Sequence, residues 1–426
     1  MSVPAHSKLH YLVHASGPIN GLVLFLAPPI LKSFALQHGS VQLIWFIFSA
    51  CIPSFFTNVM YWVDFAWPCG LAWIGLFVWW WTGVDDEYDT LRRKLICGAY
   101  LLHGARMGFG ALVMIATGTW NWRVADLPRY QFQKIRVEQN GGSWNMLVMQ
   151  KEILMQCMAN SSILFLPCFL CAIDTTSDLS PVEIAGYATW ILGWTLESVA
   201  DGHKLAWSAT PKEKRTAAFC NVGLWKYSRH PNYFGEWVAW NGLAIAAVHP
   251  MLRFGGEWGY GISGDVGKVG LSYMLLFISL SLYYCLSEWT GAVPAEYFSV
   301  QKRKGYDVYM QTTSMIIPWF VSAPGATVGG SGVVKRGRAR SKPPKPTTNN
   351  NKRQTRTPSK GKKSQKSQAR NDTPAYIRTI SRTGRTATPS RKKMEALGFS
   401  PPPASAKVAG PTPRRSVRKR TINTPA

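Results

Sequence analysis

Acidic residues are scarce in this sequence, and the scarcity is concentrated at its C-terminal end. The 426 residues include 48 Lys and Arg against 22 Asp and Glu, a formal net charge of +26. Residues 1–324 hold 22 basic and 20 acidic residues (net +2), and residues 325–426 hold 26 and 2 (net +24), which together give +26. The high pI is therefore a property of the tail and excludes no chemistry in the rest of the chain.

The patterns of a structural metal site and of a secretory leader are also missing. Of the eight cysteines, Cys168 and Cys171 have a CxxC spacing, but they lie in an apolar run, which favours small core residues. His10 and His14 share a helix face without a third ligand. Residues 1–18 have little apolar character and precede no cleavage site. We therefore expect no metal, and we expect the first apolar segment to act as its own insertion signal.

Long apolar runs dominate the chain between its two polar ends. No GxGxxG motif follows a strand pattern there, which excludes a Rossmann domain. A bilayer requires about 20 apolar residues per helix. The candidate spans are residues 19–36, 41–61, 66–84, 95–118, 153–173, 182–199, 233–248 and 269–286. Because Pro28 and Pro29 break the first of these, we predict an all-α polytopic membrane helix bundle of seven or eight transmembrane helices over residues 19–323.

The tail, residues 324–426, is rich in Gly, Ser, Thr, Pro, Lys and Arg, and this composition predicts disorder. Its charge suits nucleic acid or anionic lipid, and a solvated tail without a specific partner is the alternative. Six Ser/Thr-Pro pairs would allow phosphorylation to reduce the charge. The basic loops and the tail predict that this side of the bundle, together with residues 1–18, faces the cytosol.

Polar groups gather in one stretch, GLWKYSRHPNYFGEWVAWN at residues 223–241, just before an apolar run. Its candidate residues are Lys226, Tyr227, Arg229, His230, Asn232, Tyr233 and Glu236. Such groups at the lip of a membrane segment usually serve function, although a basic flank that holds a helix end is the alternative. In the run 95–118, His103 and Arg106 lie one turn apart, which fits either a structural ion pair or a ligand contact.

This stretch resembles the RHPNYFGE signature of the membrane proteins grouped with the steroid 5-alpha-reductase C-terminal domain, and the resemblance covers roughly residues 63–320. Asp64, in YWVDFAW, is similar to the family's VDxFW element, with a helix cap as the alternative. Glu197 and Asp201 match an ExxAD element, where His203 replaces the usual Gln. The C-terminal part of the body resembles the family's closing element, in which a Glu, here Glu296, is followed by a Gly-Tyr-x-x-Tyr run. Its matching residues also include Tyr306 and Tyr309.

The resemblance implies NADPH as the cofactor. Cationic side chains suit its phosphates, carboxylates suit its ribose hydroxyls, and an amide suits its nicotinamide. The expected cofactor-binding residues are Glu197, Asp201, Lys204, Lys226, Tyr227, Arg229, His230, Asn232, Tyr306 and Tyr309. The expected catalytic groups, which would place an acid near a substrate carbonyl, are Tyr233, Glu236 and Asp64, with Tyr61 near the last.

The family implies an endoplasmic-reticulum reductase that uses NADPH to reduce a carbon–carbon double bond in a sterol-like or other lipid. Two alternatives stay open. Isoprenylcysteine and phospholipid methyltransferases, which use S-adenosylmethionine, carry a similar RHPxY element. Sterol-reductase-like proteins also serve as non-catalytic nuclear-envelope anchors with a basic nucleic-acid-binding arm. The substrate and the oligomeric state are not determined by the sequence.

Overall fold

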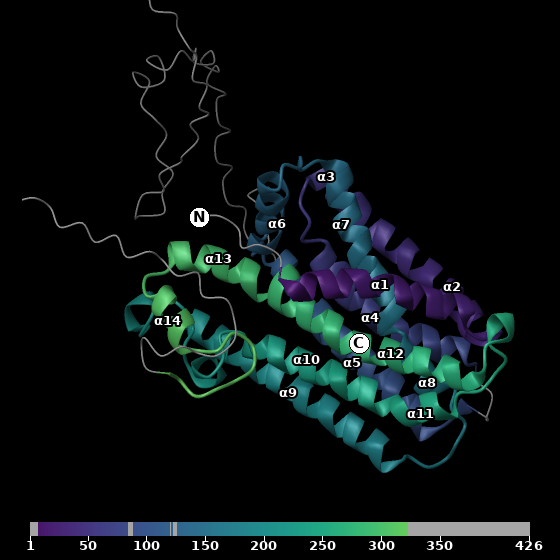
Figure 1. The fold of residues 1–426 in the computed structure, drawn as a ribbon. Helices are drawn as coiled ribbons and strands as arrows, with labels where there is room; N and C mark the ends of the chain where they lie inside the picture. Colours follow the sequence, from purple (N-terminus) through teal and green to yellow (C-terminus); the bar gives the residue numbers. More distant parts are fainter. Residues whose placement is uncertain (1–6, 84–87, 120, 122–125, 323–426) are drawn as a thin grey trace, which may run out of the picture. The chain divides into compact units, whose positions relative to one another are not determined.

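The predicted all-α architecture is confirmed. The computed structural model describes residues 7–83, 88–119, 121 and 126–322, and these residues form helices joined by loops, with no strand among them. The α-helices shown in Figure 1 are α1 (Lys8–Leu26), α2 (Pro29–Phe46), α3 (Ile52–Thr57), α4 (Val63–Trp81), α5 (Leu91–Ala116), α6 (Pro128–Gln139), α7 (Met146–Ala159), α8 (Leu166–Ala172), α9 (Pro181–Ala209), α10 (Pro231–Ala246), α11 (Val248–Arg253), α12 (Gly264–Tyr284), α13 (Ala292–Lys302) and α14 (Tyr306–Thr312). The predicted disordered tail, 324–426, lies outside the described residues.

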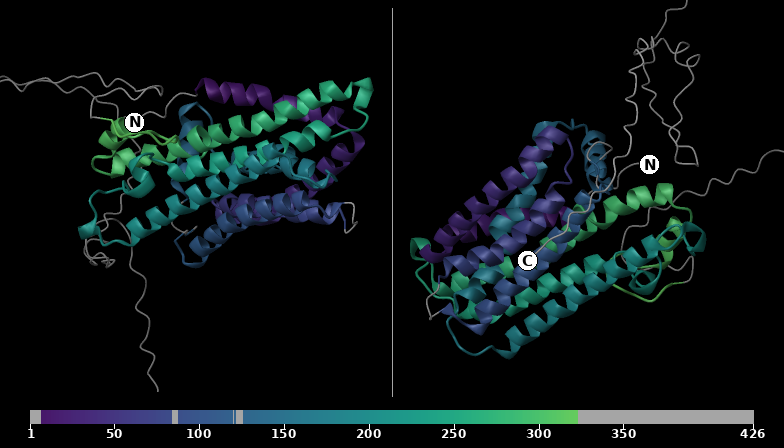
Figure 2. Two further views of the ribbon diagram at one scale, coloured as in Figure 1. Left: turned by 90° about the horizontal axis from the view of Figure 1, so that it is seen from below. Right: turned by 180° about the vertical axis from the view of Figure 1, so that it is seen from behind.

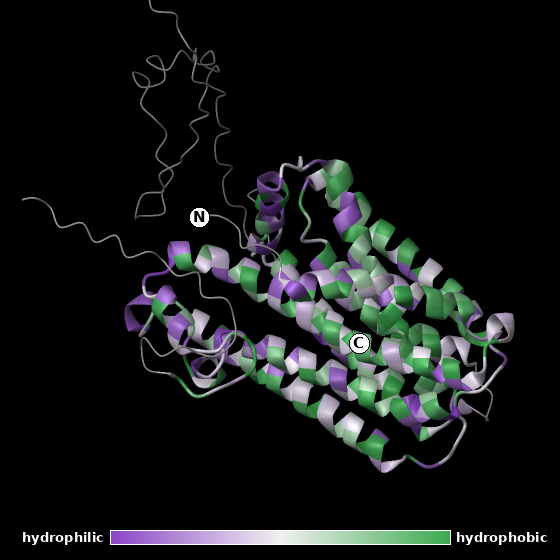
Figure 3. Ribbon diagram, viewed as in Figure 1, coloured by the Kyte–Doolittle hydropathy of each residue, from purple (hydrophilic) through white to green (hydrophobic). Residues whose placement is uncertain are grey.

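Several of these helices join into longer rods that are suited to a membrane. A π-helical turn connects α2 to α3, α7 to α8, and α12 to α13. Among the described residues, six helical segments are long and apolar enough to cross a bilayer: Lys8–Leu26, Pro29–Thr57, Val63–Trp81, Leu91–Ala116, Met146–Ala172 and Gly264–Lys302. Figure 3 shows the apolar colour running along them. The chain is therefore a multi-pass membrane protein.

The count of seven or eight crossings stays a prediction, because α9 and α10 are not among these six segments. Both helices nevertheless run beside the others, and the two views in Figure 2 show the long helices following a common direction. α10 has 16 residues, fewer than a full crossing usually needs. The predicted spans 182–199 and 233–248 correspond to these two helices.

The first predicted span, 19–36, is wrong in its position. Its two prolines separate two helices instead of bending one: α1 ends at Leu26, and α2 begins at Pro29. Proline is well suited to the first position of a helix, where its missing N–H is not needed. At the other end of α1, the Ser7 hydroxyl accepts hydrogen bonds from the amides of Leu9 and His10. The first helix therefore starts earlier than the predicted boundary at residue 19.

The closest helix pair is α9 with α10, and small residues make it possible. Gly193 of α9 lies directly against the backbone of Ala239 on α10. Gly235 of α10 lies against Glu197 of α9, where an added Cβ would be 2.5 Å from the Glu197 amide nitrogen. Small residues let membrane helices approach backbone to backbone. The contact also sets the relative position of the polar residues that follow on each helix.

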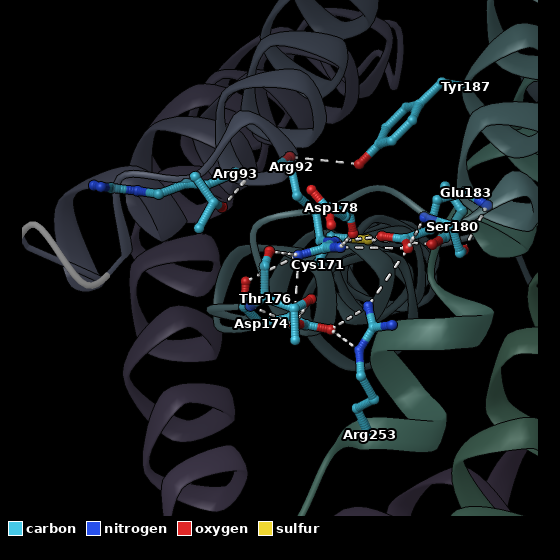
Figure 4. A network of polar contacts seen from close by, with 12 residues as sticks. Arg92, Arg93, Cys171, Asp174, Thr176, Asp178, Ser180, Glu183, Tyr187 and Arg253 are labelled. Carbon is cyan, nitrogen blue, oxygen red and sulfur yellow. Dashed lines mark hydrogen bonds and ion pairs between the residues drawn. The ribbon is translucent and has the colours of Figure 1, made fainter.

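A buried charge network closes one end of the bundle (Figure 4). Arg92, at the start of α5, pairs with Glu183 in the first turn of α9, and its Nη1 lies 3.4 Å from Oδ1 of Asp174 in the α8–α9 loop. Arg253, at the end of α11, donates from Nε to Oδ2 of Asp174 at 2.7 Å. Two cations thus face two carboxylates, so each of these four charges has a partner of opposite sign. The network fixes the starts of α5 and α9, whose later turns carry His103, Arg106, Glu197 and Asp201.

Candidate functional site

A buried acidic cluster forms where α5, α9 and α10 meet. Glu197 on α9 is 4% exposed, Glu236 on α10 is 7% exposed and His103 on α5 is 1% exposed. One ligand atom from each of these three side chains lies within 4.8 Å of the other two. The position of Gly235 against the backbone of Glu197 explains the meeting, because Glu236 is the next residue. The structure therefore brings together two predicted site residues from different helices.

Arg106 is the cation of this cluster. Its guanidinium forms an ion pair with Glu197, and its Nη1 lies 3.2 Å from Oδ2 of Asp201. Glu197 and Asp201 are one turn apart on α9, so a single arginine ties this helix face to α5. The structure thus shows the ion pair predicted for Arg106, and the alternative ligand contact stays a prediction.

A second polar group forms around Asp64, at the start of α4. The Tyr130 hydroxyl on α6 donates to Oδ1 of Asp64 at 2.8 Å, and Nη1 of Arg129 lies 3.5 Å from the same oxygen. The other oxygen, Oδ2, is buried with no hydrogen-bond partner in the described part of the chain. Asp64 makes no capping hydrogen bond to α4. Its side chain is directed to α6, which argues against the helix-cap interpretation.

Tyr233 lies near members of both polar groups. Arg129 and Asp64 of one group and Asp201 and Glu236 of the other all act electrostatically on its phenol. The ring stacks on the imidazole of His230, with centroids 5.0 Å apart and planes inclined by 4°. Thus the three predicted catalytic residues, Asp64, Tyr233 and Glu236, lie in one region, although they come from helices far apart in the sequence.

Arg229 is directed away from this region and holds the C-terminal element. Its Nε and Nη2 donate to the two oxygens of Glu296 on α13, at 2.6 and 3.1 Å. Its Nη1 donates to the backbone carbonyls of Met310, at 2.9 Å, and Thr313. Since a guanidinium has five N–H donors, at most one remains for a phosphate. The structure therefore shows Arg229 holding the C-terminal element, and the direct cofactor contact expected from the sequence stays a prediction.

His230 joins the same pair. Its Nε2 lies 3.1 Å from Oε1 of Glu296. Burial lowers the pKa of His230, and the hydrogen bond to Glu296 opposes that effect. With one ring nitrogen on Glu296 and the ring face on Tyr233, the imidazole is fixed in place beside the predicted catalytic phenol. A phosphate contact by His230 stays a prediction.

Tyr306 and Tyr309 pack the closing element onto the signature stretch. The ring of Tyr309 stacks on Phe219, and the ring of Tyr306 meets Phe219 edge to face. The Tyr309 hydroxyl donates to the carbonyls of Trp225 and Ser228. Their rings and the Tyr309 hydroxyl are thus used to hold the loop before α10. The C-terminal element thus packs against the loop before α10. Direct cofactor contacts by the two tyrosines stay predictions.

The remaining predicted cofactor residues are more accessible. Lys204, Lys226 and Tyr227 are exposed, and the ammonium of Lys204 lies 4.7 Å from the centre of the Trp225 ring. Asn232 is partly buried, and its Oδ1 is buried with no hydrogen-bond partner among the described residues. An amide oxygen in this state would accept a hydrogen bond from a ligand.

Two contributors were missed from the sequence. The indole of Trp240 donates to Oε1 of Glu236 at 3.2 Å and meets the His103 ring edge to face, with centroids 5.5 Å apart. Nδ1 of His203, the departure from the family's pattern, lies 3.4 Å from the Leu224 amide and can accept its hydrogen. The signal for Trp240 was its spacing, one turn after Glu236. No sequence signal connected His203 to a loop 21 residues away.

Comparison with known proteins adds one match. No curated protein and no solved structure matches the chain. Residues 50–255, just under half of the 426, match the model of a family described as a protein of unknown function (DUF1295), which is a steroid 5-alpha-reductase-like family. This segment runs from the end of α2 to the loop after α11 and includes most of the polar residues described above.

Proposed function

We propose that this protein is an NADPH-dependent membrane reductase that reduces a carbon–carbon double bond in a sterol-like or other lipid. The observation that carries the proposal is the setting of Tyr233, a phenol on which charged side chains of both polar groups act inside an apolar bundle. Polar clusters inside an apolar membrane bundle are costly and usually serve function. The partial match to a reductase-like family agrees with this chemistry.

The polar residues at the start of α10 and the end of α9 have functional groups that suit a dinucleotide. The unpartnered Oδ1 of Asn232 suits the amide group of a nicotinamide carboxamide. Asp201, with a half-exposed side chain, suits ribose hydroxyls, and the exposed Lys204 and Lys226 suit phosphates. NADPH, when bound, supplies the hydride. In our proposal Arg229 and His230 position the start of α10, which carries Asn232, through their contacts with Glu296.

Tyr233 is the group we propose as the acid. Reduction of an enone develops negative charge on the carbonyl oxygen, and a phenol in hydrogen-bond contact stabilises that charge and donates a proton to it. The charge of Arg129 would stabilise the resulting phenolate. Asp64 and Glu236 both act electrostatically on Tyr233, and in our proposal one of these carboxyl groups returns the proton to its phenolate.

The substrate class follows from the surroundings of this cluster. The other long helices of the bundle qualify as membrane spans, so we propose a lipid-soluble substrate that enters from the bilayer. We place the enzyme in the endoplasmic-reticulum membrane on the basis of its family resemblance, with the nuclear envelope as an extension of that membrane.

Direct cofactor binding tests the proposal. Full-length protein in detergent is titrated with NADPH, NADH and S-adenosylmethionine, and Asn232→Ala is compared with Asn241→Ala. Asn241 is also on α10, but its amide donates to the Trp237 carbonyl at 2.6 Å, so it is a matched control. We expect saturable NADPH binding that is weakened at least tenfold by Asn232→Ala and is unchanged by Asn241→Ala.

Two other outcomes would replace the proposal. Binding of S-adenosylmethionine alone would favour the methyltransferase, whose RHPxY element is similar. Binding of none of the three cofactors would favour a membrane anchor, with the basic tail as its functional part. If NADPH binds, Tyr233→Phe separates binding from catalysis, because it removes the phenol proton and keeps the ring that stacks on His230.

A further inference from the structure

The buried cluster of His103, Glu197 and Glu236 contains atoms that the protein itself does not satisfy. Neither ring nitrogen of His103 has a hydrogen-bond partner in the described structure, although the residue is 1% exposed. Its Nε2 is 3.6 Å from Oε1 of Glu236, which is too long for a good hydrogen bond. The Oε2 of Glu197 is buried and unpartnered as well. Buried polar atoms without partners cost stability, so these atoms are available to a ligand.

The charge of the cluster points to a cation. Glu197, Glu236 and Asp201 contribute three carboxylates, and their ion-pair partners in the described part of the chain are Arg106 and, when protonated, His103. No Lys or Arg there forms an ion pair with Glu236, which is 7% exposed. Burying a carboxylate without a compensating charge is strongly unfavourable. The cluster therefore holds three carboxylates against one permanent cation, Arg106, which acts on Glu236 electrostatically without forming an ion pair with it.

The ligand atoms are oriented by neighbours, as they are in metal centres. Arg106 pairs with Oε1 of Glu197, and this leaves Oε2 free. Trp240 donates to Oε1 of Glu236 at 3.2 Å and packs edge to face against the His103 ring. Such outer contacts fix first-shell ligands in known metal sites. Here they fix all three ligands without occupying the nitrogens of His103.

We propose that His103, Glu197 and Glu236 bind a divalent transition-metal ion, and that Zn²⁺ fits the donor set. Zinc accepts imidazole nitrogen and carboxylate oxygen at about 2.0–2.2 Å, and three protein ligands leave one coordination position open. A tetrahedral site requires ligand atoms about 3.3 Å apart, so the present spacing of up to 4.8 Å would contract on binding. The open position would face water or a ligand that enters beside Tyr233.

Metal content and thermal stability test this site. Full-length protein is stripped with a chelator, reloaded with Zn²⁺ or Mn²⁺, desalted and analysed for metal per chain. We expect about one tightly held Zn²⁺ per chain and a higher melting temperature than in the stripped protein. Glu236→Gln keeps the side-chain size and an oxygen for Trp240, and we expect it to lower zinc affinity at least tenfold. His103→Ala should abolish both the bound metal and the thermal shift.

His10 and His14 provide the control. Their rings are 4.1 Å apart on α1, so they are the obvious alternative zinc-binding pair. His14→Ala should leave the zinc content and the thermal shift unchanged. The melting temperature of each variant is measured with and without metal. A general loss of stability is then not mistaken for a loss of metal binding. If His103→Ala does not fold, the zinc affinity of the near-isosteric Glu236→Gln variant tests the metal site instead.

Three results would overturn the proposal: no stoichiometric zinc in reloaded wild-type protein, zinc lost in His14→Ala, or unchanged affinity in Glu236→Gln. The first would mean that Glu197 and Glu236 instead share a proton, as closely spaced carboxylates do. The metal site does not depend on the proposed reductase activity, because NADPH binding and zinc binding are measured separately and either can fail alone.

Discussion

Arg229 and Glu296 form a two-pronged ion pair across 67 positions of the chain, with hydrogen bonds of 2.6 and 3.1 Å. The arginine is 7% exposed and the glutamate is 4% exposed. The pair joins the loop before α10 to α13. Arg229 thus stabilises the fold around the signature stretch. It supports the site by holding α13 against the loop before α10.

Glu296→Gln is predicted to destabilise the protein strongly. Removing one charge of a buried pair leaves the other uncompensated, which costs about 3–5 kcal/mol. We expect a lower melting temperature in detergent and faster proteolysis after Lys302, where α13 ends. The exposed Glu138→Gln on α6 is the matched control and should behave as wild type. Equal stability of the two variants would contradict the structural role of the pair.

His230 predicts a pH dependence of stability. Burial lowers the pKa of His230 below its usual 6.5 in the folded protein. Below pH 6.5 the unfolded chain therefore binds a proton that the folded protein does not bind. The stability from neutral His230 is present above pH 6.5 and is lost as the pH falls through the lower folded pKa, by up to about 1.4 kcal/mol per pH unit.

The measurement is the melting temperature of wild type and His230→Asn between pH 8 and pH 5. The decline should be shallower in the variant. Asp126 contributes the opposite slope, because burial raises its pKa to about 6 and its stabilising effect is lost as the pH rises through that value. That contribution is common to both proteins, so the difference between them isolates His230. Parallel curves would show that another group controls the response.

The sequence alone predicted the features that depend on local pattern. Apolar runs identified the membrane helices, and helical spacing placed Glu197 and Asp201 on one face of α9, where both contact Arg106. The sequence could not predict the use of each cation. Whether Arg229 binds a phosphate or a carboxylate depends on Glu296, whose approach is set by the fold. For the same reason the sequence could not predict that Gly235 packs against Glu197, although this contact brings Glu197 and Glu236 together.

Gly193→Ala is predicted to disturb the α9–α10 contact. Its Cβ would collide with the backbone of Ala239, so the helices must separate, at a cost of about 1–3 kcal/mol. Gly202→Ala on the same helix is the matched control, because its Cβ would meet nothing within 4 Å. We expect this second change to stabilise the helix by about 0.5–1 kcal/mol. Thermal unfolding of both variants checks the pair, and equal melting temperatures would argue against the close approach of the two helices.

The basic tail is predicted to bind anionic membranes through its charge. Residues 325–426 carry a net charge of +24, and basic residues near an anionic surface contribute about 1 kcal/mol each. A peptide of residues 324–426 should cosediment with phosphatidylserine vesicles at low salt and dissociate as salt rises, because the interaction is screened.

Neutral phosphatidylcholine vesicles are the control and should not retain the peptide. Glutamate at the six Ser/Thr-Pro sites lowers the net charge from +24 to +18, since each substitution adds one negative charge, and should shift dissociation to lower salt. Duplex DNA added as a competitor distinguishes the two acidic partners. Preferential transfer of the peptide to DNA would favour the chromatin-anchor alternative, whereas retention on vesicles would place the tail against the membrane that its own helices span.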